Sequence, residues 1–241
     1  ARIVAEGGNL GLTQLARVEF ALSGGSMNTD FIDNSAGVDC SDHEVNIKIL
    51  LNSIVAQGDM TFKQRNALMA KMSDEVAQLV LNNNYQQNQA ISMASFSSAE
   101  SLNLHTRYIQ AMEKTGKIDR QLEFLPSDEE LNERRAKGVG LTRPELAVLF
   151  AYSKNILKEE IIQTDLLKDP SLSVMLQDAF PKCLTETYLE PLKSHYLAND
   201  IIATQISNRL VSDMGTTFVY QMKDETGASI SAIIRAYYVA T

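Results

Sequence analysis

Cysteine is scarce in this sequence, and its scarcity limits the kinds of fold that the chain can adopt. Only Cys40 and Cys183 occur among 241 residues. Two cysteines cannot form a disulfide framework, and neither lies in a CxxC or another metal-type spacing. A chain of this length buries roughly 70–75% of the surface of its unfolded state, so it needs no disulfide or metal to fold. We therefore expect a protein of the reducing cytoplasm without a metal site.

Basic residues and long apolar runs are also in short supply. Acidic residues outnumber basic ones by 30 to 22, which gives a formal net charge of −8 and a pI near 5.0. This balance argues against nucleic acid or an anionic membrane surface as the main partner, because both require clustered Lys and Arg. No stretch approaches the ~20 apolar residues of a membrane span, and the longest run lies around residues 146–152.

The N-terminus carries neither a secretory signal nor a starting methionine. It lacks a charged segment followed by an apolar one. Ala1 instead opens directly into sequence typical of a strand. We therefore expect the sequence to begin inside a longer polypeptide.

The part of the chain before Cys40 follows the pattern of a βαβ unit. Residues 2–5 have the composition of a short buried strand, and residues 12–23 carry apolar side chains at a helical spacing. Residues 27–32 predict a second strand, which ends at the polar segment 33–37. A strand, a helix and a strand in so short a segment predict a parallel sheet. Because one such unit cannot bury both faces of its sheet, further strands must come from elsewhere.

From residue 40 onward the strand signals nearly vanish. Capping-box spacings precede helical patterns at Thr61, Ser97, Ser127 and Thr142. Apolar residues then recur at helical intervals, which predicts about nine or ten helices in this region.

This shift in composition predicts two domains. Residues 1–39 are expected to form the C-terminal remnant of a dinucleotide-binding, Rossmann-type domain. Residues 40–241 are expected to form an all-helical C-terminal domain. The predicted fold class is thus mostly α, with a small α/β remnant.

Two loops rich in Gly and Asn follow the two predicted strands. In an open parallel sheet, ligands bind at the carboxyl ends of the strands. Gly lets the backbone approach a ligand closely, and an Asn amide offers both a donor and an acceptor. The loops are therefore candidates for cofactor binding. The same residues are common in ordinary turns, so composition alone leaves a purely structural role open.

The order and spacing of these loops carry a family resemblance. Two motifs resemble the second half of the nucleotide-binding domain of glutamate dehydrogenases: AEGGN at residues 5–9 and NSAGVDCS at residues 34–41. Two further motifs resemble the helical C-terminal region of the very long bacterial NAD-specific enzymes: GLTRPELAVL at residues 140–149 and IIATQ at residues 201–205. The resemblance covers essentially the whole chain.

This resemblance implies roles for seven residues. Five would contact the cofactor NAD: Gly7, Gly8, Asn9, Asn34 and Gly37. Among these, Asn9 matches the residue near the cofactor ribose, and Asn34 the one that meets the nicotinamide carboxamide. Two residues would contact the substrate: Val38 would line its side chain, and the Ser41 hydroxyl would meet the γ-carboxylate of glutamate.

The resemblance also implies the reaction, a hydride transfer from the Cα of L-glutamate to NAD that leads to 2-oxoglutarate and ammonia. In the family a Lys and an Asp perform the acid–base work, and both belong to sequence that precedes the part matched here. No GxGxxG motif for the cofactor pyrophosphate occurs either. We therefore assign no catalytic residue to this chain and expect it to be inactive alone. The full-length protein is expected to be a bacterial, cytoplasmic homo-oligomer.

Two alternatives stay open at this point. The chain could be a non-catalytic helical interaction or oligomerisation domain, in which Asn9 and Asn34 are turn residues and Ser41 forms a capping box with Glu44. It could also belong to a dehydrogenase for another amino acid, because leucine and phenylalanine have no γ-carboxylate for a serine to recognise. If the two loops bind one cofactor, they should lie side by side.

Overall fold

Helices account for nearly all of the regular structure of the chain. The computed structural model describes all 241 residues. Its α-helices are α1 (Gln14–Leu22), α2 (Asp30–Asp33), α3 (Ser35–Gln57), α4 (Phe62–Lys71), α5 (Ser73–Phe96), α6 (Leu102–Lys114), α7 (Asp128–Ala136), α8 (Arg143–Ile162), α9 (Val174–Asp178), α10 (Lys182–Thr187), α11 (Leu189–Lys193), α12 (Ala198–Met214), α13 (Phe218–Thr226) and α14 (Ile230–Ala240). Two short 3-10 helices, η1 (Asp165–Lys168) and η2 (Pro170–Ser173), connect α8 to α9. None of these helices combines the length and apolar character needed to cross a bilayer.

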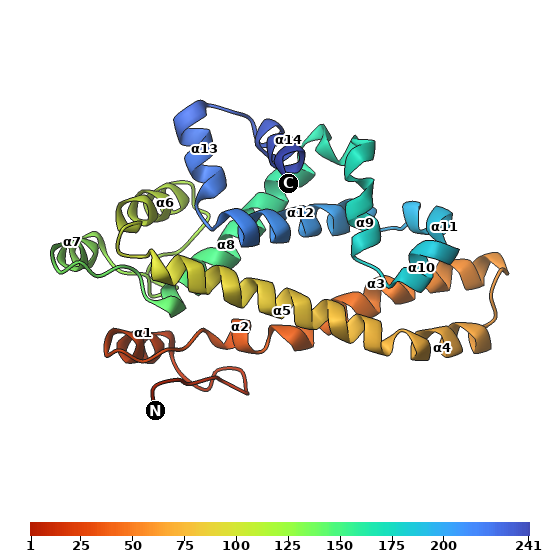
Figure 1. Cartoon of the computed structure of the whole chain (residues 1–241), viewed down its shortest axis with the longest axis horizontal. Helices are drawn as coiled ribbons and strands as arrows, with labels where there is room; N and C mark the ends of the chain where they lie inside the picture. Colours follow the sequence, from red (N-terminus) through yellow and green to blue (C-terminus); the bar gives the residue numbers. More distant parts are fainter.

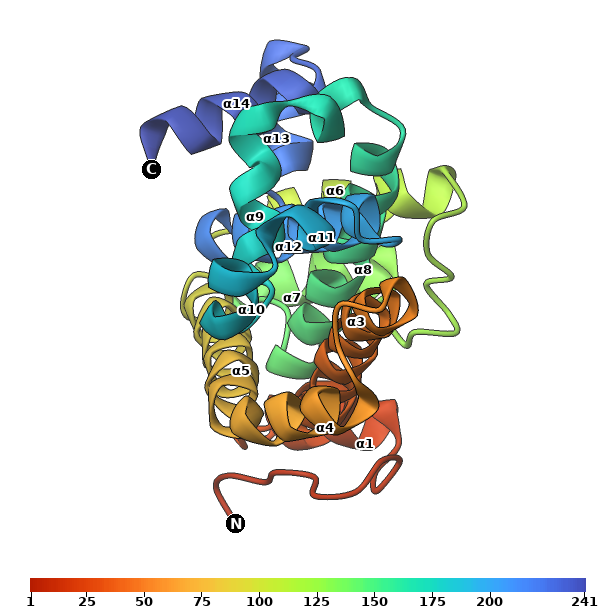
Figure 2. The same cartoon turned by 90° about the vertical axis from the view of Figure 1, so that its right-hand side faces the viewer.

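The main core forms where α8 and α12 pack along each other, with α5 against both and α3 against α5. Buried residues such as Leu50, Leu157 and Ile206 belong to this core. In both views the N-terminal segment with α1 lies at the bottom of the molecule, and α13 and α14 lie at the top (Figure 1, Figure 2). The N-terminal segment and the last two helices therefore lie on opposite sides of the fold.

A second, smaller core lies on the other side of α8. Ile109 of α6 and Leu131 of α7 pack there with Leu146 and Leu149 of α8. Apart from Arg143 and Glu145, the first half of α8 is apolar around its circumference, as expected for a helix buried between two cores. This central position explains why so much of the sequence of α8 is hydrophobic.

Most of the predicted capping boxes form. Thr61 and Ser127 each exchange hydrogen bonds with the Gln or Glu three residues later, and Glu145 accepts from both the backbone N–H and the hydroxyl of Thr142. The prediction for Ser97 is wrong, because Ser97 is the C-cap of α5 and the next helix begins only at Leu102. The working caps have extended backbone, whereas Ser97 has φ −98 and ψ 12, so the start signal requires the chain to enter the helix from an extended residue.

The predicted Rossmann-type remnant is wrong. All that remains of the expected parallel sheet is one isolated parallel bridge between Ile3 and Ser26. Two backbone hydrogen bonds make it, from the Val4 N–H to the Ser26 oxygen at 3.0 Å and from the Ser26 N–H to the Arg2 oxygen at 2.8 Å. Ile3 is 74% exposed, so the segment 2–5 is not a buried strand. A ladder of this size needs further strands or a covering helix to become a sheet.

The second predicted strand and the loop after it are helical. Met27 and Ile32 are buried at 2% and 3% exposure, as core residues should be, but the chain turns into α2 between them. Thr29 has the extended backbone of an N-cap, and acidic residues occupy the first turn of α2, where the helix dipole favours them. Asn34 is then the N-cap of α3. The polar residues that suggested a loop therefore start a helix.

The helical part of the predicted fold class is confirmed. Helix α3 runs without interruption from Ser35 to Gln57 and so passes through positions 39 and 40. A domain boundary after residue 39 stays a prediction, and the Rossmann-type character of residues 1–39 is withdrawn.

Candidate functional site

A buried cluster of charges holds the loop at residues 6–12. Arg17 of α1 donates to Glu6 from Nε at 2.6 Å and from Nη2 at 3.0 Å. The same Nη2 lies 3.2 Å from Oδ1 of Asp30 in α2. The side chains of Arg17 and Glu6 are only 6% and 4% exposed, and the hydrogen bond with Glu6 raises the pKa of Arg17. The fork of one guanidinium thus ties two carboxylates from different segments together.

The same carboxylates also bind the backbone of the loop. Glu6 accepts a hydrogen bond from the Leu12 N–H at 2.9 Å, and Asp30 accepts one from the Leu10 N–H at 2.8 Å. Leu10 has φ 60, a left-handed conformation that costs a non-glycine residue roughly 1–2 kcal/mol. These hydrogen bonds offset that cost, and they hold residues 7–9 in place at the exposed tip of the loop.

Asn34 joins this loop to the start of α3. Its Nδ2 donates to the backbone oxygens of Glu6 and Asp30, both at 2.9 Å. The Glu6 N–H in turn donates to Oδ2 of Asp33 at 2.9 Å. Two carbonyl acceptors fix the orientation of the Asn34 amide, so that its Oδ1 is the atom left to meet a ligand. The loop and the N-terminus of α3 therefore touch, at a helix start instead of at strand ends.

The predicted cofactor residues offer room and hydrogen-bonding groups. Gly7, Gly8, Asn9 and Gly37 are exposed. No atom lies within 4 Å of the place where a Cβ would stand on any of the three glycines. A ligand can approach the backbone there, and Oδ1 of Asn34 can accept from the N–H groups of a carboxamide. These residues fit the nicotinamide side of a dinucleotide, although nothing here cradles a pyrophosphate.

The two predicted substrate residues lie on the first turns of α3. Val38 is 67% exposed. Ser41 is exposed too, and its hydroxyl donates to the Gly37 oxygen at 3.2 Å. Because Ser41 lies inside α3, it does not cap a helix, and the capping box with Glu44 is wrong. The Ser41 hydroxyl makes only a long bond within its own helix, which a carboxylate could replace.

A polar groove runs beside Val38 between α3, α5, α8 and α12. Val38 and Asp39 form its α3 wall, and the other walls include Asn83, Lys154 and Asn208 around a volume of about 200 Å³. Asn83 donates to Asp39 at 2.9 Å. The groove thus brings residues far apart in the sequence beside a predicted substrate residue.

Among the charged groups of this groove, Lys154 is the one whose pKa the surroundings change most. Its Nζ stands 4.2 Å from the centroid of the Phe150 ring. Burial lowers the pKa of Lys154 to about 8, and the negative charge of Asp39 opposes this effect. An amine with a depressed pKa in a groove is a candidate for anion binding or proton transfer.

Sequence reasoning missed Lys154 and the Glu6–Arg17–Asp30 cluster. Glu6 lies within the motif at residues 5–9, yet its side chain carried no sign of a buried partner. Lys154 cannot be distinguished by pattern from Lys158 one turn later, because its burial depends on packing between helices far apart in the sequence. No local signal was available for either feature.

Comparison with known proteins identifies the class of the chain. Residues 1–94 match the family model described as the catalytic domain of bacterial NAD-glutamate dehydrogenase, and residues 138–241 match the one described as the C-terminal part of glutamate dehydrogenase. The two matches cover the loop, the start of α3 and the helices that form the groove. Both matches place the chain in the class of the glutamate dehydrogenases.

Individual relatives narrow the class to one family. The chain is 54% identical over 239 residues to an NAD-specific glutamate dehydrogenase of Pseudomonas aeruginosa and 50% identical over 239 residues to one of Halomonas elongata, with 99% of the chain covered in each case. It is 44% identical over its whole length to one of Mycobacterium tuberculosis. The chain belongs to the bacterial NAD-specific glutamate dehydrogenase family. It spans about 15% of the length of these relatives.

Proposed function

We propose that this chain is part of an NAD-dependent glutamate dehydrogenase, which oxidises L-glutamate to 2-oxoglutarate and ammonia. The observation that carries the proposal is the 44–54% identity to three enzymes of that name over essentially all of the chain. When bound, the nicotinamide would accept the hydride, and the protein would supply orientation and binding.

Within that enzyme, we propose that the loop at 6–9 and the start of α3 face the cofactor. Gly7, Gly8 and Gly37 would let its surface approach the backbone, and Asn9 and Asn34 would supply amide groups. The hydrogen bonds that Arg17 donates to Glu6 and that Asp30 accepts from Leu10 support this role, because they fix the loop without using its exposed tip. A preorganised loop loses little conformational entropy when a ligand binds.

We also propose that the first turns of α3 face the substrate, with Val38 beside the substrate side chain and Ser41 donating to the γ-carboxylate. Both side chains are exposed and project from a rigid helix. A site built to donate to a carboxylate discriminates against substrates that lack one. Purified full-length enzyme should therefore reduce NAD with L-glutamate but not with L-leucine or L-phenylalanine. Absence of NAD reduction with L-glutamate would overturn the proposal.

The chain by itself is proposed to be inactive. The family's catalytic Lys and Asp have no matching positions here, and the sequence has no GxGxxG motif. The isolated chain should give no glutamate-dependent NAD reduction and weak or no NAD binding by calorimetry. Turnover by the isolated chain would contradict this part of the proposal.

A homo-oligomeric, cytoplasmic full-length protein is proposed as well. Exposed apolar side chains on α1, Leu15 at 58% and Leu22 at 51%, support contacts of this helix with other parts of the assembled protein. Analytical ultracentrifugation of the full-length enzyme and fractionation of the source cells test the two points. A monomer in the first experiment or a membrane fraction in the second would refute the corresponding point.

A further inference from the structure

A pocket between α6, α8, α12 and α13 shares no residue with the loop at 6–9. Its volume is about 240 Å³. Met112, Leu157 and Val211 line it with apolar side chains and are at most 3% exposed. An apolar cavity of about 150 Å³ is enough to bind a benzene ring. The pocket therefore has room for one substituted ring.

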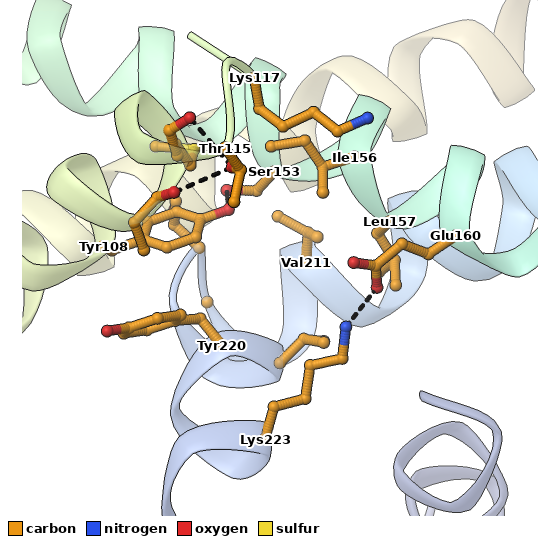
Figure 3. Close-up of a pocket in the computed structure, with 15 residues that line it drawn as sticks. Tyr108, Thr115, Lys117, Ser153, Ile156, Leu157, Glu160, Val211, Tyr220 and Lys223 are labelled. Atoms are coloured by element: carbon orange, nitrogen blue, oxygen red, sulfur yellow. Dashed lines mark hydrogen bonds and ion pairs between the residues drawn. The ribbon is translucent and has the colours of Figure 1, made fainter. Parts of the chain in front are cut away.

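Aromatic rings form one side of the pocket. Tyr108 of α6 and Tyr220 of α13 lie with their ring centroids 5.2 Å apart and their planes tilted by 41°. Figure 3 shows these two rings on one side and Val211 and Leu157 facing them across the pocket. Aromatic pairs prefer such offset or tilted arrangements at 4.5–7 Å, and a ligand ring would extend the set.

The charges around the pocket are already neutralised. Lys223 lies 2.6 Å from Glu160, and Lys117 lies 2.6 Å from Glu159. Figure 3 shows the ion pair of Lys223 and Glu160 on the side away from the tyrosine rings. A charged ligand would find no unpaired charge of opposite sign among these residues. The pocket therefore favours an uncharged ligand.

One hydrogen-bond acceptor remains free in the apolar interior. The Ser153 hydroxyl donates its single proton to the Leu149 oxygen at 2.7 Å. The arrangement that satisfies both contacts has the Tyr108 hydroxyl donating to Ser153 across 2.9 Å. The Tyr108 oxygen keeps its own acceptor capacity, so a ligand with an O–H or N–H group can satisfy it.

Helix α13 is a weakly held wall of this pocket. None of its residues is buried. The C-cap of the preceding helix α12, Gly215, and the C-cap of α13 itself, Gly227, both have positive φ. Its ion pairs, Lys223 with Glu160 and Arg107 with Asp224, are partly or well exposed. Exposed ion pairs stabilise little, so α13 is held mainly by the packing of Phe218, Val219 and Tyr220 against the two cores.

We propose that this pocket is a binding site for a compact, uncharged aromatic molecule that carries one hydrogen-bond donor, as a phenol does. The ring packs against Met112, Leu157 and Val211, and the donor group binds the Tyr108 oxygen. The site is separate from the loop at 6–9 and the groove beside Val38, and it does not depend on the proposed dehydrogenase function.

The test uses para-cresol and toluene, which differ only by the hydroxyl, as probes of the 241-residue chain. Binding is followed through the methyl resonance of Met112 by NMR titration. Para-cresol should bind about 2- to 10-fold more tightly than toluene, the range of one net hydrogen bond. Tyr108→Phe should remove this difference and leave toluene binding unchanged. Tyr152→Phe, whose hydroxyl bonds to Glu123 instead, should change neither.

A second variant keeps the proposal testable if Tyr108→Phe does not fold. Val219→Trp places a large ring in the pocket from α13 and should abolish the binding of both probes. The chain has no other tryptophan, so the emission of the new indole reports whether it is buried. An unshifted Met112 resonance at saturating para-cresol, or unchanged para-cresol affinity in Tyr108→Phe or in a buried Val219→Trp, would overturn the proposal.

Discussion

Arg17 and Glu6 form a two-point ion pair, with Nε 2.6 Å from Oε2 and Nη2 3.0 Å from Oε1, and both side chains are almost fully buried. Through this pair α1 holds the loop that presents residues 7–9. The relationship links the stability of the N-terminal segment to the geometry of the proposed cofactor site.

Replacing Arg17 by Met should lower the free energy of unfolding by about 3–5 kcal/mol, because Glu6 would be left as an uncompensated buried charge. Urea denaturation of the chain measures the loss. Lys168→Met is the matched control, since Lys168 pairs with Asp165 on the surface, both more than 80% exposed, and should change stability little. Equal effects of the two substitutions would refute the structural role given to Arg17.

The buried amine of Lys154 should destabilise the folded chain. Its folded pKa of about 8 lies below the usual 10.5, so the unfolded chain binds the proton more tightly and the charged amine opposes folding near neutral pH. Lys154→Met should therefore raise the free energy of unfolding by about 1–3 kcal/mol near neutral pH. The gain should shrink as the pH rises through 8 toward 10.5. Urea denaturation at both ends of this range measures it, and exposed Lys63→Met is the control. A loss of stability in Lys154→Met would contradict the account.

His105 should make the chain sensitive to acid. It is 4% exposed, and burial lowers its pKa from 6.5 to about 4. Between these two pH values the unfolded state binds a proton at His105 that the folded state does not bind. The contribution of neutral His105 to stability is therefore complete above a pH of about 6.5 and is lost as the pH falls toward 4. The loss amounts to about 3 kcal/mol. His105→Gln should flatten this part of the stability profile, and an unchanged profile would count against the assignment.

Substitution of Gly37 should have opposite effects on the stability of the chain and on cofactor binding. It lies in the first turn of α3 with open space around it, so Gly37→Ala should stabilise the chain by about 0.5–1 kcal/mol. In the full-length enzyme the added methyl group should obstruct the cofactor and raise the KM for NAD several-fold, with the KM for glutamate little changed. Improved stability together with an unchanged KM for NAD would remove Gly37 from the proposed cofactor site.

The sequence predicted the helical region well because its signals are local. Thr61, Ser127 and Thr142 start helices where their capping spacings indicate. The prediction failed between residues 27 and 37, where a short apolar run and a polar cluster match both a strand with a loop and two helix starts. Tertiary packing decided between these, since Met27 and Ile32 reach the core from an extended segment and a short helix.

The candidate site was only partly accessible to sequence reasoning. The loop motifs identified Asn9, Asn34 and Ser41 by resemblance, and the family assignment is confirmed by the comparisons. The roles of these residues stay predictions. The groove around Lys154 is assembled from α3, α5, α8 and α12, and no spacing within one helix can reveal a contact made between four.

The most direct test of the central claim is the KM for L-glutamate of Ser41→Ala in the full-length enzyme. Ser23→Ala is the control, because the Ser23 hydroxyl also donates to the oxygen four residues earlier, at 2.9 Å. Loss of one hydrogen bond to a carboxylate should raise the KM about 10- to 100-fold in Ser41→Ala alone, with the KM for NAD unchanged. A KM for glutamate that stays the same in both variants would contradict the claim that α3 presents Ser41 to the substrate.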